Sequence, residues 1–335
     1  MEAVAALPRA AVRTDEVSLA LVQRGGGRTE WVFTERAANA PPLARMHAGL
    51  EAMHACAQLH QSDPDTYWWW LADASLTFLG EELRARRFAL VDGMLGPVAI
   101  RALRDEVREV RALGRLAASK LAGGRDGNKL TYTHSGVRGD LVGWFDGDEP
   151  ELWRGGAFNK FLQKIDTMVA QLAEHVPDLV GISTRSKAMV TCYPGNGARY
   201  IKHCDNSCDT GRGERCNGRR LTVIMYLNED WQPTDGGELR LYEPYAPKDK
   251  PPVADVQPLL DRLIMFYADY RVPHEVLPAH ADRLAITVWY FDREEYAGAR
   301  ERGCSATDML EQEAIENEIA RFENRYGGKA ERHRK

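Results

Sequence analysis

The chain has 335 residues, of which 44% are hydrophobic and 28% charged, a composition typical of a globular protein with a full core. A net charge of −5 argues against nucleic acid as a main partner, because phosphate binding needs a basic surface. No run approaches the roughly 20 apolar residues of a membrane span, and the first ten residues contain an early acid, so neither a membrane segment nor a secretory signal is predicted.

Residues 1–75 are predicted to form an N-terminal extension that is partly helical. Residues 1 to about 40 mix Arg, Gly and Ala, with a break at Arg24–Arg28, which indicates a weakly ordered lead-in. Apolar residues recur at helical spacing from Pro42 to His60 and predict an amphipathic helix. The consecutive tryptophans Trp68–Trp70 cannot all face one core, so we expect some of them to pack between this extension and the main body.

Helices and strands alternate in the next part of the chain. Phe88–Asp92 is predicted as a strand, and Gly96-Pro97 opens a helix to about Lys120, since proline is tolerated in a first turn. Residues 122–140 are rich in Gly, Asp, Asn and Ser and predict a loop, followed by a strand at Leu141–Phe145 and a helix over Gly156–His175. One apolar stripe on the first helix comprises Ile100, Leu103, Val107, Val110 and Leu113.

After Gly181 short β-rich segments alternate with turns, a pattern typical of a sandwich or jelly roll. They are Lys187–Tyr193, Arg199–His203, Leu221–Leu227, Glu238–Tyr242, Leu263–Tyr267 and Arg283–Phe291. We therefore predict an α+β fold with a double-stranded β-helix (jelly roll) core at about 181–292 and helices packed on one sheet. The domain is expected to span 76–295, and 296–335 to form a polar helix, from near Ser305 to Tyr326, and a basic tail.

Two histidines and an aspartate form a candidate metal site. His203 and Asp205 stand at i and i+2, so on a strand both side chains project from the same face. His274 lies on a later element, as expected of a third ligand from a neighbouring strand. Two imidazoles and one carboxylate hold Fe(II) while leaving positions open for a co-substrate and oxygen. Arg283 is suited to bind the carboxylate of an organic acid at that metal.

The alternatives to this site are a chance His-x-Asp pattern and a zinc site at Cys204, Cys208 and Cys216. The first two cysteines have a zinc-like spacing, but Cys216 lacks a close partner. The six cysteines are sparse and lack a disulfide-framework pattern, so we expect a reducing compartment, cytoplasmic and/or nuclear.

Several ordered motifs resemble the prolyl 4-hydroxylases of the hypoxia-inducible-factor (egg-laying-nine-like) type, which depend on Fe(II) and 2-oxoglutarate. The resemblance covers about 80–295 and is most specific in the second half, where several motifs match in order. They are Lys187–Gly197, Tyr200–Asn206, Tyr226–Trp231, Gly236–Arg240, Asp261–Leu263, Pro273–Val276 and Arg283–Asp292.

The resemblance implies a role for each site residue. His203, Asp205 and His274 would be the iron ligands, and Arg283 with Tyr226 would bind the distal carboxylate of 2-oxoglutarate. Arg219 resembles an arginine that holds a substrate-covering loop, about 122–140, with Asp140 of the Arg138-Gly139-Asp140 turn as its ion-pair partner. The implied lining of the co-substrate pocket comprises Met189, Tyr193, Ile224, Leu239, Thr287 and Trp289.

The implied reaction is 4-hydroxylation of a proline in a protein or peptide, using O₂ and releasing succinate and CO₂, with L-ascorbate keeping the iron reduced. The resemblance also implies that the protein takes part in oxygen sensing. Between Asp205 and Arg219 the chain is longer than the animal enzymes, and residues 1–75 and the C-terminal helix have no match, so the protein substrate stays open. The alternatives are an oxygenase acting on another residue or a small molecule, and a non-catalytic sensor that binds a metal or organic acid.

Overall fold

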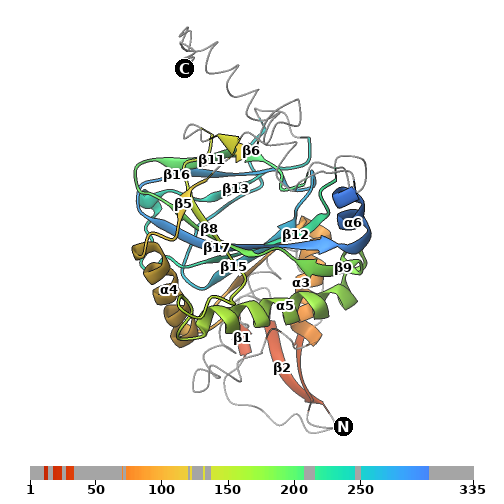
Figure 1. The fold of residues 1–335 in the computed structure, drawn as a ribbon. Helices are drawn as coiled ribbons and strands as arrows, with labels where there is room; N and C mark the ends of the chain where they lie inside the picture. The colour runs from red at the N-terminus through yellow and green to blue at the C-terminus, as the bar shows by residue number, and fades with distance from the viewer. Residues whose placement is uncertain are drawn as a thin grey trace, which may run out of the picture.

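The structure is a computed structural model, and it combines antiparallel β-sheets with a few helices (Figure 1), which confirms the α+β prediction. No described helix is both long and apolar enough to cross a membrane. The structure describes residues 11–13, 18–24, 28–33, 70, 73–119, 121–122, 131–132, 137–206, 216–245 and 250–301.

An eight-stranded antiparallel sheet forms the larger layer. Its order is β4-β15-β12-β17-β10-β8-β5, and β9 pairs with the far end of β17. Every side chain of β10 and β12 is buried, as is nearly all of β17, because both faces of the sheet centre are covered. The strands are β4 (Phe88–Asp92), β5 (Ala117–Ala118), β8 (Leu141–Phe145), β9 (Ile182–Arg185), β10 (Ala188–Tyr193), β12 (Arg219–Tyr226), β15 (Arg262–Tyr267) and β17 (Arg283–Asp292).

A four-stranded sheet of order β11-β16-β13-β14 lies on one side of the larger sheet (Figure 1). It buries one face only, so side chains alternate: Leu239 and Leu241 are buried whereas Arg240 between them pairs with Asp255 at the surface. The strands are β11 (Ala198–His203), β13 (Leu239–Leu241), β14 (Ala254–Val256) and β16 (His274–Ala279).

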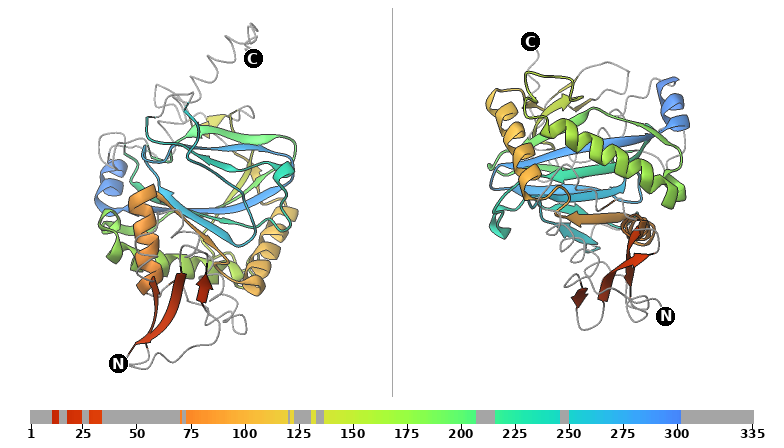
Figure 2. Two further views of the ribbon diagram at one scale, coloured as in Figure 1. Left: turned by 180° about the vertical axis from the view of Figure 1, so that it is seen from behind. Right: turned by 90° about the horizontal axis from the view of Figure 1, so that it is seen from below.

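Helices α3, α4 and α5 cover the opposite side of the larger sheet (Figure 2). They are α3 (Asp73–Arg86), α4 (Pro97–Ala112) and α5 (Ala157–His175). The α4 stripe is buried as predicted as far as Val110, but the helix ends at Ala112 rather than near Lys120. Leu113 is 55% exposed and Gly114 has φ +68°, a left-handed conformation that ends the helix.

At the N-terminal ends of α4 and α5, backbone amides donate hydrogen bonds to carboxylates that are distant in sequence. Asp261 accepts hydrogen bonds from Leu95 N and Gly96 N, each at 2.8 Å, at the start of α4. Glu106 of α4 accepts from Phe158 N at 2.8 Å at the start of α5. These bonds satisfy amide groups that a helix N-terminus leaves without partners. Burial raises the pKa of Asp261 to about 7.

The strands near the N-terminus were not predicted. β1 (Ala11–Arg13), β2 (Ser18–Arg24) and β3 (Arg28–Phe33) form a three-stranded sheet, so the expectation of a weakly ordered lead-in is wrong for these residues. Trp70 is fully buried, and Trp68 and Trp69 lie outside the described residues. The predicted helices at Pro42–His60 and Ser305–Tyr326 lie outside the described residues, and so does most of the predicted loop at 122–140. The strand β6 (Leu121–Ala122) ends at the first residue of that loop, and β7 (Thr131–Tyr132) lies within it.

The predicted strands all form, with ends shifted by at most two residues, and α5 begins one residue later than expected. The sequence did not predict α3, β9, β14 or β16. It also did not predict α6 (Arg293–Glu301), which follows β17 directly. Short 3₁₀ turns at Pro177–Leu179 and Pro233–Asp235 complete the described elements.

Candidate functional site

Three side chains with metal-binding groups meet between the two sheets. His203 ends β11 and is paired in register with His274, the first residue of β16. Asp205 follows two residues after His203. The carboxylate of Asp205 lies 3.8 Å from His203 Nε2 and 3.7 Å from His274 Nε2, and one ligand atom from each residue lies within 4.8 Å of the others. The strand pairing therefore brings together the ligand set expected from the sequence.

Each histidine is oriented by a backbone carbonyl two residues before it. His203 Nδ1 lies 2.8 Å from Ile201 O, and His274 Nδ1 lies 3.0 Å from Val272 O. A carbonyl only accepts, so each Nδ1 carries the proton and each Nε2 presents a lone pair toward Asp205. Burial, and then His274, lowers the pKa of His203 to about 3, which keeps its ring neutral. Both rings are therefore prepared as ligands.

The Asp205 carboxylate is held as an anion. Burial by itself would raise its pKa, but the charge of the Arg219 guanidinium and a hydrogen bond from Thr222 oppose burial, and the pKa of Asp205 lies below its usual value. Thr222 on β12 donates this hydrogen bond to Asp205 Oδ2 at 2.7 Å. A buried, ionised carboxylate between two neutral imidazoles suits a divalent cation.

A pocket with about 640 Å³ of empty space opens beside these ligands. It is lined from both sheets by His203, Asp205, His274 and Arg283, and by all the predicted co-substrate residues except Tyr226. Tyr226 is fully buried, and its ring lies next to the guanidinium of Arg283. Arg219, which was predicted to hold the substrate-covering loop, also lines the pocket. The sequence did not predict the remaining lining residues, which are Arg138, Trp144, Thr191, Tyr200, Thr222, Val276 and Ala285.

Arg283, the first residue of β17, provides a buried positive charge in the lining of the pocket. It is 2% exposed, and its Nε donates to Gly237 O at 2.7 Å. Its guanidinium carbon lies 5.0 Å from the Tyr226 ring and 5.1 Å from the Tyr193 ring. The Tyr226 hydroxyl is buried and makes no hydrogen bond of full geometry with the described residues. A cation and an unsatisfied hydroxyl side by side suit a carboxylate ligand.

The predicted ion pair between Asp140 and Arg219 is wrong. Asp140 is buried and forms a two-pronged pair with Arg138, with N–O distances of 2.7 and 3.0 Å. Arg138 stands only two residues away and reaches Asp140 without crossing the pocket. The Arg219 guanidinium instead lies 4.0 Å over the Trp289 ring and donates to Asp205 O at 3.3 Å. Arg219 therefore belongs to the metal side of the pocket.

The cysteines differ from the expectation. Cys216 is disulfide-bonded, whereas Cys192 and Cys204 are free thiols. A bonded Cys216 cannot serve as a zinc ligand together with Cys204, and the proposed cysteine zinc site fails for this reason. Among the described residues, only His203, Asp205 and His274 form a group able to hold a metal.

Comparison with known proteins agrees with this geometry. Residues 188–291 match the 2OG-Fe(II) oxygenase superfamily. Mouse prolyl hydroxylase EGLN3 is 39% identical over 225 residues, 67% of this chain and 86% of that protein. Human Egl nine homolog 1 is 37% identical over 63% of this chain and 45% of that protein.

Solved structures give the same result. A prolyl hydroxylase from Trichoplax adhaerens, in complex with a fragment of the hypoxia-inducible-factor oxygen degradation domain, is 31% identical with a TM-score of 0.57 over 70% of this chain and 98% of that one. A Pseudomonas putida prolyl-4-hydroxylase is 28% identical with a TM-score of 0.52 over 65% of this chain and 99% of that one. The chain belongs to the EGLN-type prolyl hydroxylase family of 2OG-Fe(II) oxygenases.

Proposed function

We propose that this dioxygenase hydroxylates a proline of a protein or peptide at the 4-position, consuming 2-oxoglutarate and O₂ and releasing succinate and CO₂, in a pathway that senses oxygen. The observation that carries the proposal is the meeting of the His203–Asp205–His274 group with the buried Arg283 in one pocket. The reaction needs both parts: a metal with open positions and a clamp for a dicarboxylic acid.

The residues of the pocket fit both a divalent metal ion and a dicarboxylic acid. The Nε2 lone pairs of His203 and His274 and the anionic Asp205 match the N,N,O donor set of a non-haem iron site. The buried guanidinium of Arg283 and the unsatisfied hydroxyl of Tyr226 match a carboxylate. Iron(II), when bound, supplies the activation of O₂ that links decarboxylation of the keto acid to insertion of one oxygen atom into a C–H bond.

The protein side chains perform the positioning. Arg283 and Tyr226 fix the distal end of 2-oxoglutarate, so its other end is directed toward the histidines. Met189, Ile224 and Leu239 form apolar walls that exclude water from the space between, and Thr287, Tyr193 and Trp289 complete the lining. Excluding water strengthens the charge pairing and protects reactive species.

The wider proposal follows the family. The two sheets with the ligands between them support a double-stranded β-helix, with 76–295 as the catalytic domain, 1–75 as an extension and 296–335 as a C-terminal segment. We propose L-ascorbate as the reductant that keeps the iron divalent, and no nucleic acid or membrane partner.

The proposal is tested with the full chain, Fe(II), ascorbate and 2-oxoglutarate. Succinate formation should need Fe(II) and should rise when a proline-containing peptide is added, and mass spectrometry should find one added oxygen atom on the proline. The matched control is the same peptide with alanine in place of proline. Fe(II)-dependent turnover that gives no oxidised proline in any candidate peptide would instead favour another oxygenase substrate, and absence of turnover would favour a sensor.

Trp144 forms part of the pocket wall and is 42% exposed, with its ring 5.6 Å from that of Trp289. We propose that these rings contact the substrate peptide. Trp144→Ala should raise the KM for the peptide by about thirtyfold, since loss of an aromatic anchor at an interface costs about 2 kcal/mol. The KM for 2-oxoglutarate should stay constant. Tyr245→Ala, at an aromatic that is 70% exposed and is absent from the pocket lining, is the control and should change neither constant.

A further inference from the structure

The three metal-binding residues are not held in the same way. His203 and His274 belong to strands and are fixed by the β11–β16 pairing. Asp205 comes after the end of β11, where no strand ladder holds the backbone. The position of its carboxylate therefore depends on other hydrogen bonds to residues 205 and 206.

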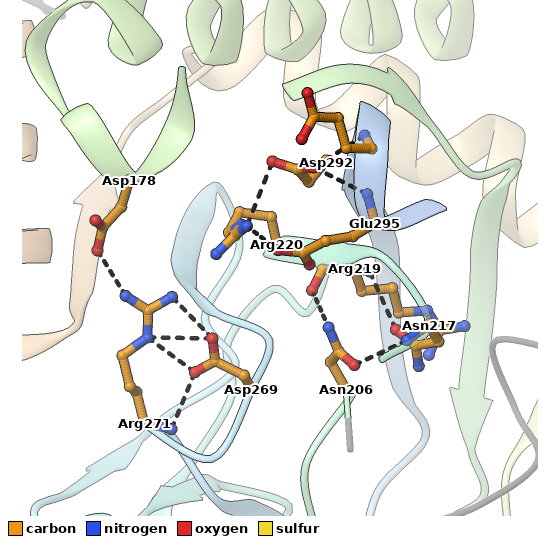
Figure 3. A network of polar contacts seen from close by, with 10 residues as sticks. Asp178, Asn206, Asn217, Arg219, Arg220, Asp269, Arg271, Asp292 and Glu295 are labelled. Carbon is orange, nitrogen blue, oxygen red and sulfur yellow. Dashed lines mark hydrogen bonds and ion pairs between the residues drawn. The ribbon is translucent and has the colours of Figure 1, made fainter. Parts of the chain in front are cut away.

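Asn217 and Arg219, whose bonds to Asn206 can be followed in Figure 3, supply the bonds to residue 205, and a backbone carbonyl accepts the bond from residue 206. Asn217 Nδ2 donates to Asp205 O at 2.9 Å, and Arg219 Nη1 donates to the same oxygen at 3.3 Å. Asn206 N donates to Ala268 O at 2.8 Å, which ties the next residue to the end of β15. The backbone on the C-terminal side of the Asp205 side chain is thus fixed from two directions.

The two asparagines also bind each other and the start of β12. Asn217 N donates to Asn206 Oδ1 at 3.1 Å, and Asn206 Nδ2 donates to Arg219 O at 2.7 Å. Arg219 N donates to Asn217 Oδ1 at 3.0 Å. Both amides therefore use a donor and an acceptor, and both side chains are buried. In a buried network each satisfied bond supports the others.

Asn217 lies between the metal-binding residue Asp205 and the first residue of β12, Arg219. Asn206 and Asn217 lie on either side of residues 207–215, and Cys216 before Asn217 is buried and disulfide-bonded. Gly218 has φ +83°, and an added Cβ would lie 2.6 Å from Tyr296 Cα of α6, so this segment is packed closely against the domain.

We propose that Asn217 is a positioning residue for the metal site, acting through the backbone carbonyl of Asp205. The inference rests on the proposed function, in which Asp205 is a metal ligand. Residues that orient a metal ligand change metal affinity by roughly ten- to a hundredfold when replaced. Asn217 has no contact with the pocket lumen, so its effect should fall on metal binding and not on the KM for 2-oxoglutarate.

The test measures Co(II) binding by visible absorption, with no turnover and in buffer without thiols, so that the Cys216 disulfide stays intact. Asn217→Asp is nearly isosteric but places an oxygen against Asp205 O. It should raise the Kd for Co(II) by about tenfold. Asn228→Asp is the matched control, because Asn228 is also 6% exposed and also binds backbone groups, at Pro258 O, Leu284 O and Leu284 N. It should lower the Tm and leave the Kd unchanged.

A Kd for Asn217→Asp within twofold of the wild-type value, or an equal rise in the Asn228→Asp control, overturns the proposal. If wild-type protein itself binds no Co(II), the ligand assignment fails instead. Asn217→Ala, which removes the amide without adding a charge, replaces the Asp variant if that protein does not fold. Hydrogen exchange of the Arg219 amide in wild-type protein gives a second reading: Zn(II) should slow it, and unchanged exchange would contradict the coupling.

Discussion

His274→Ala is expected to reduce 2-oxoglutarate-dependent succinate formation by at least about a hundredfold, since loss of a ligand should exceed the loss caused by replacing the groups that orient ligands. His274 is buried, and its Nε2 faces Asp205 at 3.7 Å, so an alanine there leaves only His203 and Asp205 as donors. Succinate is measured with saturating Fe(II), and metal content is measured in parallel.

His280→Ala is the matched control for this prediction. His280 lies six residues further along, just after the end of β16, and is exposed, so its variant should keep wild-type turnover. Retained succinate formation in the His274 variant would remove His274 from the metal site. Equal losses in both variants would point to a folding defect rather than a missing ligand.

Arg283→Ala is expected to raise the KM for 2-oxoglutarate by at least about thirtyfold. Removing one partner of a buried ion pair costs about 2–5 kcal/mol, because the other charge is left unpaired, and 1.4 kcal/mol corresponds to about tenfold. Arg283 is 2% exposed and lies beside Tyr226, so water does not replace its guanidinium easily. Initial rates are measured against 2-oxoglutarate concentration.

Arg283→Lys should give an intermediate KM, since lysine keeps the charge but cannot make a two-pronged bond. Arg240→Ala removes the same charge from a two-pronged pair with Asp255 on the outer surface of the smaller sheet, and should leave the KM unchanged. A normal KM in Arg283→Ala would place the co-substrate carboxylate elsewhere in the pocket.

Prediction from the sequence succeeded for elements whose type is set by the spacing of residues within the element itself. Phe88–Asp92, Leu141–Phe145 and the helix ending at His175 have apolar spacing that fixes their type, and the structure has them nearly as predicted. The spacing of His203 and Asp205 predicts a shared face for their side chains, and these two residues do meet His274. Such local signals are the most dependable part of a sequence.

Interactions between distant residues escaped prediction. The start of α4 depends on Asp261, more than 160 positions further on, so nothing local marks it. β16 was missed because Pro278 interrupts an otherwise alternating run. Trp144 enters the pocket wall through its register with Met189, and register follows from strand order rather than from composition. The pairing of Asp140 with Arg138 is local, only two residues apart, and was missed because the expected partner, Arg219, was taken from the resemblance.

The position of β17 in the larger sheet has a consequence for biosynthesis. It is the last strand along the described chain, yet it lies between β12 and β10 and joins β4-β15-β12 to β10-β8-β5. Pairings between residues far apart in sequence form slowly and expose strand edges until they close. A nascent or truncated chain that ends before Arg283 therefore contains all three metal-binding residues. It lacks the strand that joins the two halves of the larger sheet, and it lacks the arginine expected to bind the co-substrate. Catalytic competence is acquired only after nearly the whole domain has been translated.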